Sequence, residues 1–256
     1  MSDTPKPKLR VLRRHATATG PGAGRRLVLV HGSLDRATSF TRLMGRLRDW
    51  TIVAYDRRGY AGSAVTGPPT TFDDQVDDLI EVLDGVPAVA FGHSFGGDVV
   101  LATAAINPEL IPAAFVWEPP QPWLPWWAEA TGSRSGEAEL DPDERAEWFM
   151  RRMVGDKVWE RLPASTRAQR RREGHTLHAE ITSVTVAPAF DPSAIGIPVL
   201  VGRGGRSSRH QQRAAEELAA ALPAGELVDI EDAGHGAHLS HPAEVAAWLE
   251  QLADRA

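Results

Sequence analysis

Short apolar runs alternate with amphipathic stretches along most of the chain. Most of these runs are apolar at consecutive positions, as expected of strands buried between two layers of helices. They cover residues 27–30, 51–55, 88–91, 113–117, 198–201 and 226–230, and residues 9–14 fit an edge strand. Helical patterns occur at residues 39–48, 72–83, 95–105, 210–221 and 242–252. This alternation predicts an α/β fold with a mostly parallel, doubly wound sheet and helices on both faces.

The alternation breaks between residues 119 and 190. This stretch begins with a segment rich in proline and tryptophan, passes through a polar segment at 131–139, and carries helical patterns at 141–153 and 165–178. The tryptophans argue against disorder. We therefore expect residues 1–118 and 191–256 to form the α/β core and residues 119–190 to form a helical cap over the site. A separate small domain or a linker is the alternative.

Composition narrows the class of protein. The 256 residues suit one large α/β domain or two small ones. The absence of cysteine excludes disulfides, thiolate catalysis and cysteine-ligated metals. A net charge of −6 gives no indication of nucleic-acid binding. The polar start has no apolar segment of signal-peptide length, and no later run approaches membrane-spanning length. We expect a cytoplasmic protein without membrane or nucleic-acid partners, and the oligomeric state is left open.

The strongest chemical signal is Gly92-His93-Ser94-Phe95-Gly96-Gly97. It places a serine in a G-x-S-x-G frame between an apolar run and a helical pattern. Strand, tight turn and helix are the context of a nucleophile elbow, in which the strained turn requires small neighbours. Ser94 is therefore the predicted nucleophile. The alternative is a glycine-rich turn with a solvated serine.

Three further motifs accompany the elbow in order along the chain. They are His31-Gly32-Ser33-Leu34, the turn from Asp56 to Ser63 with the pattern D-x-R-G-x-A-x-S, and the loop from Ala233 to Pro242 around His235. With these four motifs the chain resembles the serine hydrolases of the α/β-hydrolase fold superfamily over nearly its whole length. The turn departs from the family pattern at Ala61, where glycine is usual.

A serine hydroxyl needs a general base, and histidine is the usual one because its pKa lies near neutral pH. The resemblance assigns this role to His235, which follows the last predicted strand. His238 and His241 are the competing histidines. We expect His238 to pack or to line the pocket, and His241 to lie at the surface near a helix start.

The third member of a triad is a carboxylate that orients the histidine. Family members usually carry it after the strand that follows the cap, but residues 201–209 contain no carboxylate. Some members carry it after the strand that follows the elbow helix, where this chain has Glu118. Glu118 is therefore the predicted acid, with Asp191 as runner-up and Asp98 expected to be structural. If neither Glu118 nor Asp191 serves, the site is a Ser–His dyad.

The resemblance also implies an oxyanion hole, in which backbone N–H groups bind the negative oxygen that develops during acyl transfer. We expect one donor at Phe95 and the second at Ser33, with Leu34 close behind, while His31 braces the loop. His93 is expected to pack in the fold. His175 and His178 could share a helix face, but no third ligand is evident near them. No metal and no cofactor are predicted.

Serine at position 94 argues against the dehalogenases and epoxide hydrolases of this superfamily, which attack with a carboxylate. The predicted function is hydrolysis of an ester, lactone or thioester of a small hydrophobic molecule; a diketone is a further option. A cyclase, lyase or acyltransferase on the same fold, or a relative that binds a hydrophobic ligand without turnover, is the alternative. Predicted pocket residues, which could equally pack in the cap, are Trp117, Trp123, Trp126, Trp127 and His238.

Overall fold

The centre of the molecule is a seven-stranded sheet with the strand order β1-β3-β2-β4-β5-β6-β7. The computed structural model describes residues 8–17, 19, 23–131 and 140–255. Strand β1 pairs antiparallel with β3, and all other pairs are parallel. This confirms the predicted fold class. The strands are β1 (Val11–Arg14), β2 (Arg26–Val30), β3 (Thr51–Tyr55), β4 (Val89–His93), β5 (Ala114–Trp117), β6 (Val199–Gly204) and β7 (Gly225–Ile230).

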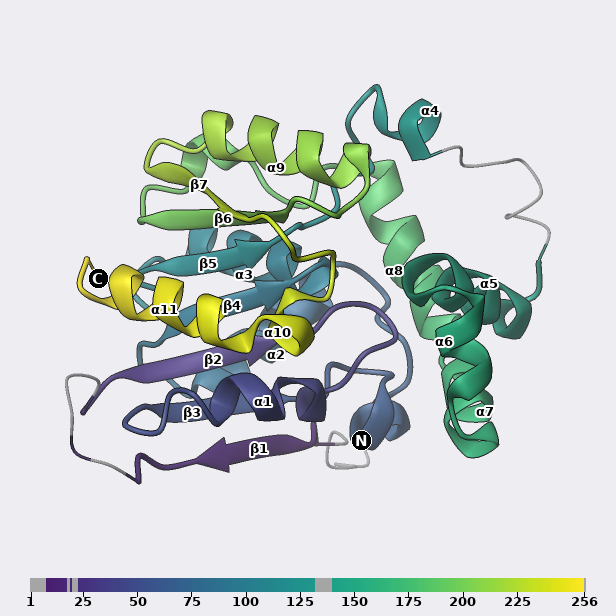
Figure 1. Cartoon of the computed structure of the whole chain (residues 1–256), viewed down its shortest axis with the longest axis horizontal. Coiled ribbons are helices and arrows are strands. Elements are labelled where there is room, and N and C mark those ends of the chain that lie inside the picture. The colour runs from purple at the N-terminus through teal and green to yellow at the C-terminus, as the bar shows by residue number, and fades with distance from the viewer. Residues whose placement is uncertain (1–7, 18, 20–22, 132–139, 256) are drawn as a thin grey trace, which may run out of the picture.

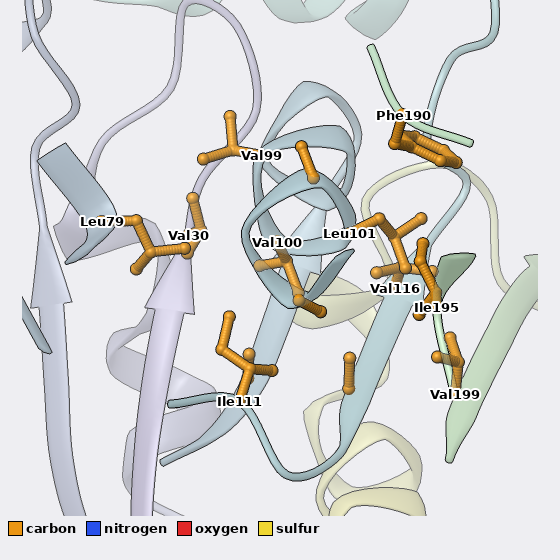
Figure 2. Close-up of a cluster of buried hydrophobic side chains, with 14 of the residues drawn as sticks. Val30, Leu79, Val99, Val100, Leu101, Ile111, Val116, Phe190, Ile195 and Val199 are labelled. Carbon is orange, nitrogen blue, oxygen red and sulfur yellow. The ribbon is translucent and has the colours of Figure 1, made fainter. Parts of the chain in front are cut away.

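Helices cover both faces of the sheet because its strands are apolar on both sides. In β2, Val28 and Val30 belong to the cluster under α2 (Asp73–Leu83), α3 (Phe95–Ile106) and α9 (Arg209–Ala221). Leu27 and Leu29 point to the opposite cluster, under α1 (Thr41–Met44) and α11 (Pro242–Ala253). Figure 2 shows side chains of α3 packed between the strands on the first face. Burial of two apolar layers fixes the sheet register, since a one-residue slip would exchange the two faces.

Among the described residues, five α-helices lie between β5 and β6 along the chain and form the helical insertion, our name for residues 119–190. In Figure 1 they lie beyond the carboxyl ends of the parallel strands. A polar segment predicted at 131–139 lies mostly outside the described residues. The helices are α4 (Trp127–Thr131), α5 (Pro142–Val154), α6 (Asp156–Arg161), α7 (Ala164–Arg172) and α8 (Gly174–Val186).

Two predicted helices differ from those in the structure. The pattern at 39–48 forms a short 3-10 turn, Ala37–Phe40, followed by α1, which ends before Gly45; glycine is a poor helix former. The pattern at 165–178 is split into α7 and α8. A Cβ atom at Gly174 would lie 1.8 Å from the carbonyl oxygen of Pro142, so the start of α8 passes directly against the start of α5.

Across the described residues, the helices are all too short or too polar to span a lipid bilayer.

Candidate active site

Ser94 stands at the junction of β4 and α3 in a strained backbone conformation, with φ 52° and ψ −131°. Its amide N–H donates to the carbonyl of Trp117 at 2.9 Å, which ties the turn to β5. The neighbours must be small: a Cβ at Gly96 would lie 2.3 Å from the Val30 carbonyl oxygen, and one at Gly92 would lie 2.6 Å from the Gly96 carbonyl oxygen. A strained, over-determined turn of this kind fixes the direction of the serine side chain.

Glu118 directly follows β5, also with a positive φ of 47°, and is 2% exposed. Its Oε1 accepts the N–H of Gly204 at 2.8 Å, and its Oε2 lies 2.7 Å from Nδ1 of His235. The backbone bond from Gly204 anchors the carboxylate, and the second oxygen is left for the histidine. With Nδ1–H donating to Glu118, Nε2 of His235 is the nitrogen that can accept a proton.

The two other carboxylates considered for this role lie elsewhere. Asp191 is exposed and accepts the backbone and side-chain donors of Ser193 at 2.9 and 2.7 Å, so it caps a short 3-10 turn, Pro192–Ala194, before β6. Asp98 is fully buried in α3 and has no hydrogen-bond partner among the described residues. Burial raises the pKa of Asp98 well above its ordinary value.

The loop after β2 brings the expected oxyanion donors to the same place. Ser33 and Phe95 both line a cavity together with Ser94. His31 is fully buried beneath the loop: its Nδ1 lies 2.7 Å from the Gly32 carbonyl, and its Nε2 accepts the N–H of Arg57 at 2.9 Å. Burial lowers the pKa of His31 to about 4, so the ring is neutral and braces the loop as expected.

Leu34 does not line this cavity. It has a positive φ of 54° and is 1% exposed, in a cluster with Tyr60 and Leu177. Its side chain therefore anchors the loop against the insertion.

The cavity has a volume of about 290 Å³ and is walled by both the core and the insertion. The core contributes Ser33, Ser94, Phe95, Glu118, His210, Gln211 and His235. Most of the insertion's contribution is apolar and aromatic, with a few polar side chains. These insertion residues include Trp127, Ala128, Thr131, Trp148, Phe149, Arg152, Met153, Ile181, Val184 and Thr185. Sequence reasoning missed all of these except Trp127, because an amphipathic pattern shows that a helix has an apolar face but not what that face meets.

Of the four tryptophans expected in the pocket wall, only Trp127 lines the cavity. Trp117 is fully buried in the core beside Phe115, because alternation along β5 turns it toward the face under α11. Trp123 packs edge-on against Phe190, with ring centroids 5.4 Å apart. Trp126 donates to Glu217 of α9 at 2.8 Å. The guanidinium carbon of Arg213, also in α9, lies 4.1 Å from the ring centre of Trp126, so this indole packs on α9 rather than lining the cavity.

His238 also differs from the pocket expectation, because it does not line the cavity. It is fully buried against Phe40 and His93, and its Nε2 lies 3.6 Å from Oδ2 of Asp35. Asp35, His93 and His238 place ligand atoms within 4.8 Å of one another, so they are the group that could hold a metal ion within the described residues. His93 Nε2 is 2.9 Å from the carbonyl oxygen of His235, which ties this group to the histidine loop.

His241 lies outside the cavity, at the N-terminal end of α11, with Nδ1 2.8 Å from the hydroxyl of Ser240. Of the three histidines that compete for the role of base, His235 alone lines the cavity that holds Ser94.

Comparisons with known proteins find hydrolases that are similar to this chain. A segment of 108 residues is 32% identical to a lipase, LipV, of Mycobacterium tuberculosis, and this segment spans 41% of each chain. An alpha/beta hydrolase from Sphaerobacter thermophilus is similar in structure over 94% of this chain and 95% of its own, with 29% identity and a TM-score of 0.69. A thermophilic esterase from Thermogutta terrifontis matches over 96% and 93% with a TM-score of 0.73, but at 22% identity it shows the fold alone.

The family model described as the alpha/beta hydrolase family matches residues 27–248, which include the elbow, the oxyanion loop and the histidine loop. The chain belongs to the alpha/beta hydrolase family.

Proposed function

We propose that this protein is a serine hydrolase that cleaves an ester, lactone or thioester of a small hydrophobic molecule through Ser94, His235 and Glu118. The observation that carries the proposal is the 2.7 Å contact between Glu118 Oε2 and His235 Nδ1, at a cavity that also holds Ser94. A carboxylate that fixes the tautomer of a histidine beside an elbow serine is the arrangement that acyl transfer requires.

In the proposed reaction, Nε2 of His235 takes the proton of the Ser94 hydroxyl as its oxygen attacks the carbonyl carbon. Glu118 stabilises the imidazolium that forms. The N–H groups of Phe95 and Ser33 bind the oxyanion, each worth about 3 kcal/mol of transition-state stabilisation. His235 then returns the proton to the leaving group, which departs and leaves an acyl-enzyme. Water activated by His235 attacks this ester and restores Ser94.

The cavity supports a small apolar substrate. Its volume of about 290 Å³ lies at the lower end of the range for small-molecule sites, about 300–1,000 Å³. Trp148, Phe149 and Met153 of α5 and Ile181 of α8 supply apolar wall opposite the triad. In this proposal residues 119–190 act as the cap that the sequence predicts, because the substrate is enclosed between them and the core.

Labelling with a fluorophosphonate probe tests the nucleophile. We expect the wild-type protein to be labelled at Ser94, Ser94→Ala to remain unlabelled, and both to have the same thermal unfolding temperature. A panel of 4-nitrophenyl esters, thioesters and lactones then identifies the bond that is cleaved, and incorporation of oxygen from labelled water separates hydrolysis from acyl transfer or cyclisation. A folded wild-type protein that is neither labelled nor active on the panel would overturn the proposal in favour of a ligand-binding relative.

A further inference from the structure

Glu180 of α8 is a carboxylate that the proposed chemistry does not use, yet it is fully buried where the insertion meets the core. Its Oε1 accepts from the Arg57 guanidinium and from Gln75 Nε2 at 2.9 Å. Its Oε2 accepts from the Ser33 hydroxyl at 2.6 Å and from the Tyr60 hydroxyl at 2.7 Å. Two carboxylate oxygens offer about four lone-pair sites, so every site on this buried group is filled.

The donors on Glu180 come from three separate parts of the core. Ser33 belongs to the loop after β2, Arg57 and Tyr60 to the turn after β3, and Gln75 to α2. One side chain of the insertion therefore holds together three core segments that are far apart in the sequence. Of these contacts, the one to Ser33 reaches the cavity wall beside Ser94.

Arg57 extends the hold of Glu180 to the rest of the oxyanion loop. Its Nε donates to the His31 carbonyl at 2.7 Å, and its backbone N–H donates to His31 Nε2 at 2.9 Å. Its guanidinium carbon also lies 5.0 Å from the ring centre of Phe95. Burial works to lower the pKa of Arg57, but the neighbouring Glu180 outweighs it and the pKa is raised, so the guanidinium stays charged. The pair thus braces residues on both sides of the proposed oxyanion hole.

We propose that Glu180 is a positioning residue, which holds Ser33 and the His31 loop in the geometry that binds the oxyanion and thereby makes that geometry depend on docking of the insertion. This inference rests on the proposed function. Because the Ser33 hydroxyl donates its hydrogen to Glu180, only its acceptor lone pairs are available to the cavity. The oxyanion is then bound by backbone N–H groups, whose placement Glu180 controls.

Glu173 is a matched control for this role. It is also buried, at 3% exposure, and also ties the insertion to the core, since its Oε1 accepts the N–H of Ala61 at 2.9 Å. It also forms ion pairs with Arg36 and Arg170, and within the described part of the chain it makes no hydrogen bond or ion pair with Ser33 or Phe95. Loss of Glu173 therefore removes insertion–core contacts but none to the two proposed oxyanion donors.

The experiment compares Glu180→Ala and Glu180→Gln with Glu173→Ala and Glu173→Gln in the full chain. The readouts are kcat and KM for 4-nitrophenyl butyrate, the rate of fluorophosphonate labelling, inhibition by phenylboronic acid, whose tetrahedral adduct occupies an oxyanion hole, and the thermal unfolding temperature. Removal of an oxyanion donor lowers kcat by about 10²–10³-fold, and misplacement of one should cost about 30-fold.

We expect kcat, the labelling rate and boronate affinity to fall together in Glu180→Ala, with KM changed less than about threefold, because the lost interaction acts in the transition state. Glu180→Gln should be intermediate. The carbonyl oxygen of the glutamine can still accept from Arg57, but its NH2 group can only donate to the Ser33 hydroxyl, which would then be the acceptor. The Glu173 variants should keep kcat within about threefold even if they lose stability, since the hole is untouched.

Ser33→Ala keeps the backbone N–H and removes only the link to Glu180, so it decides the case if Glu180→Ala does not fold. We expect Ser33→Ala to lower kcat about tenfold alone and in the Glu173→Gln background, but less than about threefold in the Glu180→Gln background, because coupled residues are non-additive. Equal effects in both backgrounds, or equal kcat losses for the Glu180 and Glu173 variants, would overturn the positioning role and leave the hydrolase proposal standing. A folded wild type that is neither labelled nor active on the ester panel would overturn both.

Discussion

The α/β core and the helical insertion hold their polar side chains in different ways. In the core, Ser94 and Glu118 each directly follow a strand, in strained backbone conformations set by backbone hydrogen bonds to neighbouring strands. In the insertion, helices are tied to one another by partly exposed ion pairs: Arg151 of α5 pairs with Asp156 and Glu160 of α6, and Arg171 of α7 pairs with Glu147 of α5. Exposed pairs of this kind are each worth at most about 1 kcal/mol.

Contacts between the two regions are of a third kind, because they depend on buried carboxylates. Glu173 and Glu180 are 3% and 0% exposed, and both accept hydrogen bonds from the turn after β3. A buried polar group that loses its hydrogen-bond partner costs about 1–3 kcal/mol, so removal of these contacts should cost more than removal of a surface ion pair. The comparison indicates that Ser94 and Glu118 are positioned by the sheet, whereas the cavity wall and, in our proposal, the loop of Ser33 depend on how the insertion docks.

The largest effect on kcat is expected when Glu118, the carboxylate that the sheet positions, is changed. Glu118→Gln keeps the shape of the side chain but removes the charge that would stabilise the imidazolium of His235, and an equivalent change in a serine protease lowers kcat about 10⁴-fold. We expect a loss of about 10³–10⁴-fold in kcat with normal thermal unfolding, measured on whichever ester the wild type cleaves.

Asp191→Asn is the matched control, because Asp191 is the other carboxylate that the sequence offers for this role and lies at the exposed cap of a 3-10 turn. Its kcat should equal that of the wild type. A large loss of kcat in Asp191→Asn with none in Glu118→Gln would show that Asp191, before the start of β6, is the triad acid instead of Glu118.

The next test asks how much the buried carboxylates at the junction control stability. Burial raises the pKa of Glu173 to about 7 from an ordinary value of 4.5. Between these pH values the native state keeps its proton while the unfolded chain has lost it, so folding stability falls as pH rises through this window. Over this span, at about 1.4 kcal/mol per pKa unit, the loss is about 3 kcal/mol.

Glu173→Gln removes this titration. The free energies of unfolding of wild type and variant, measured with urea, should therefore diverge by about 3 kcal/mol in favour of the variant between pH 5 and pH 8. Parallel curves across that range would show that Glu173 ionises freely in the folded protein.

The same difference between regions explains what could be predicted from the sequence. In the core, the residues that carry the sequence pattern are also those that the local geometry requires. A Cβ at Gly92 or Gly96 would lie within 3 Å of neighbouring backbone, and the apolar side chains of β2 contribute to the clusters on both faces of the sheet. The strands of a mostly parallel sheet, the elbow and the approach of Glu118 to His235 are accordingly within reach of sequence reasoning. The assignment of catalytic roles to these residues stays a prediction.

For the insertion, the sequence predicts helices but not their buried polar contacts with the core. Glu180 is separated by 147 positions from Ser33, and no motif links them. The sequence predicts Trp117, Trp123 and Trp126 as pocket residues because they are aromatic and close to Glu118 along the chain. In the structure, their side-chain directions are set by β5, Phe190 and α9, respectively. A buried polar contact between distant elements leaves no periodic signal, so a single sequence does not reveal it.

A smaller effect is expected where the insertion lines the cavity. Met153 of α5 lies in the wall, whereas the next residue, Val154, is exposed and outside it. Met153→Ala should raise KM for an apolar ester about three- to tenfold with kcat within about twofold, because it removes apolar contact that substrate and transition state share. Val154→Ala should leave both constants unchanged. A fall in kcat with unchanged KM for Met153→Ala would mean that α5 acts on the chemistry rather than on binding.

The smallest effect concerns the turn at which the core meets Glu173. Ala61 stands where the family motif usually has glycine, and it has a φ of 45°. A left-handed conformation costs an L-residue about 1–2 kcal/mol, and glycine avoids this cost. Glycine also increases the conformational entropy of the unfolded chain, which lowers folding stability by about 0.4–1 kcal/mol. Ala61→Gly should therefore raise stability by about 0.5 kcal/mol, or about 1–2 °C in thermal unfolding.

Asp84→Gly is the control, because Asp84 also has a positive φ, 53°, but aspartate tolerates this region better. Equal gains at both sites would mean that the strain at Ala61 is general to the backbone; a gain only at Ala61 would locate it in the turn that Glu173 binds.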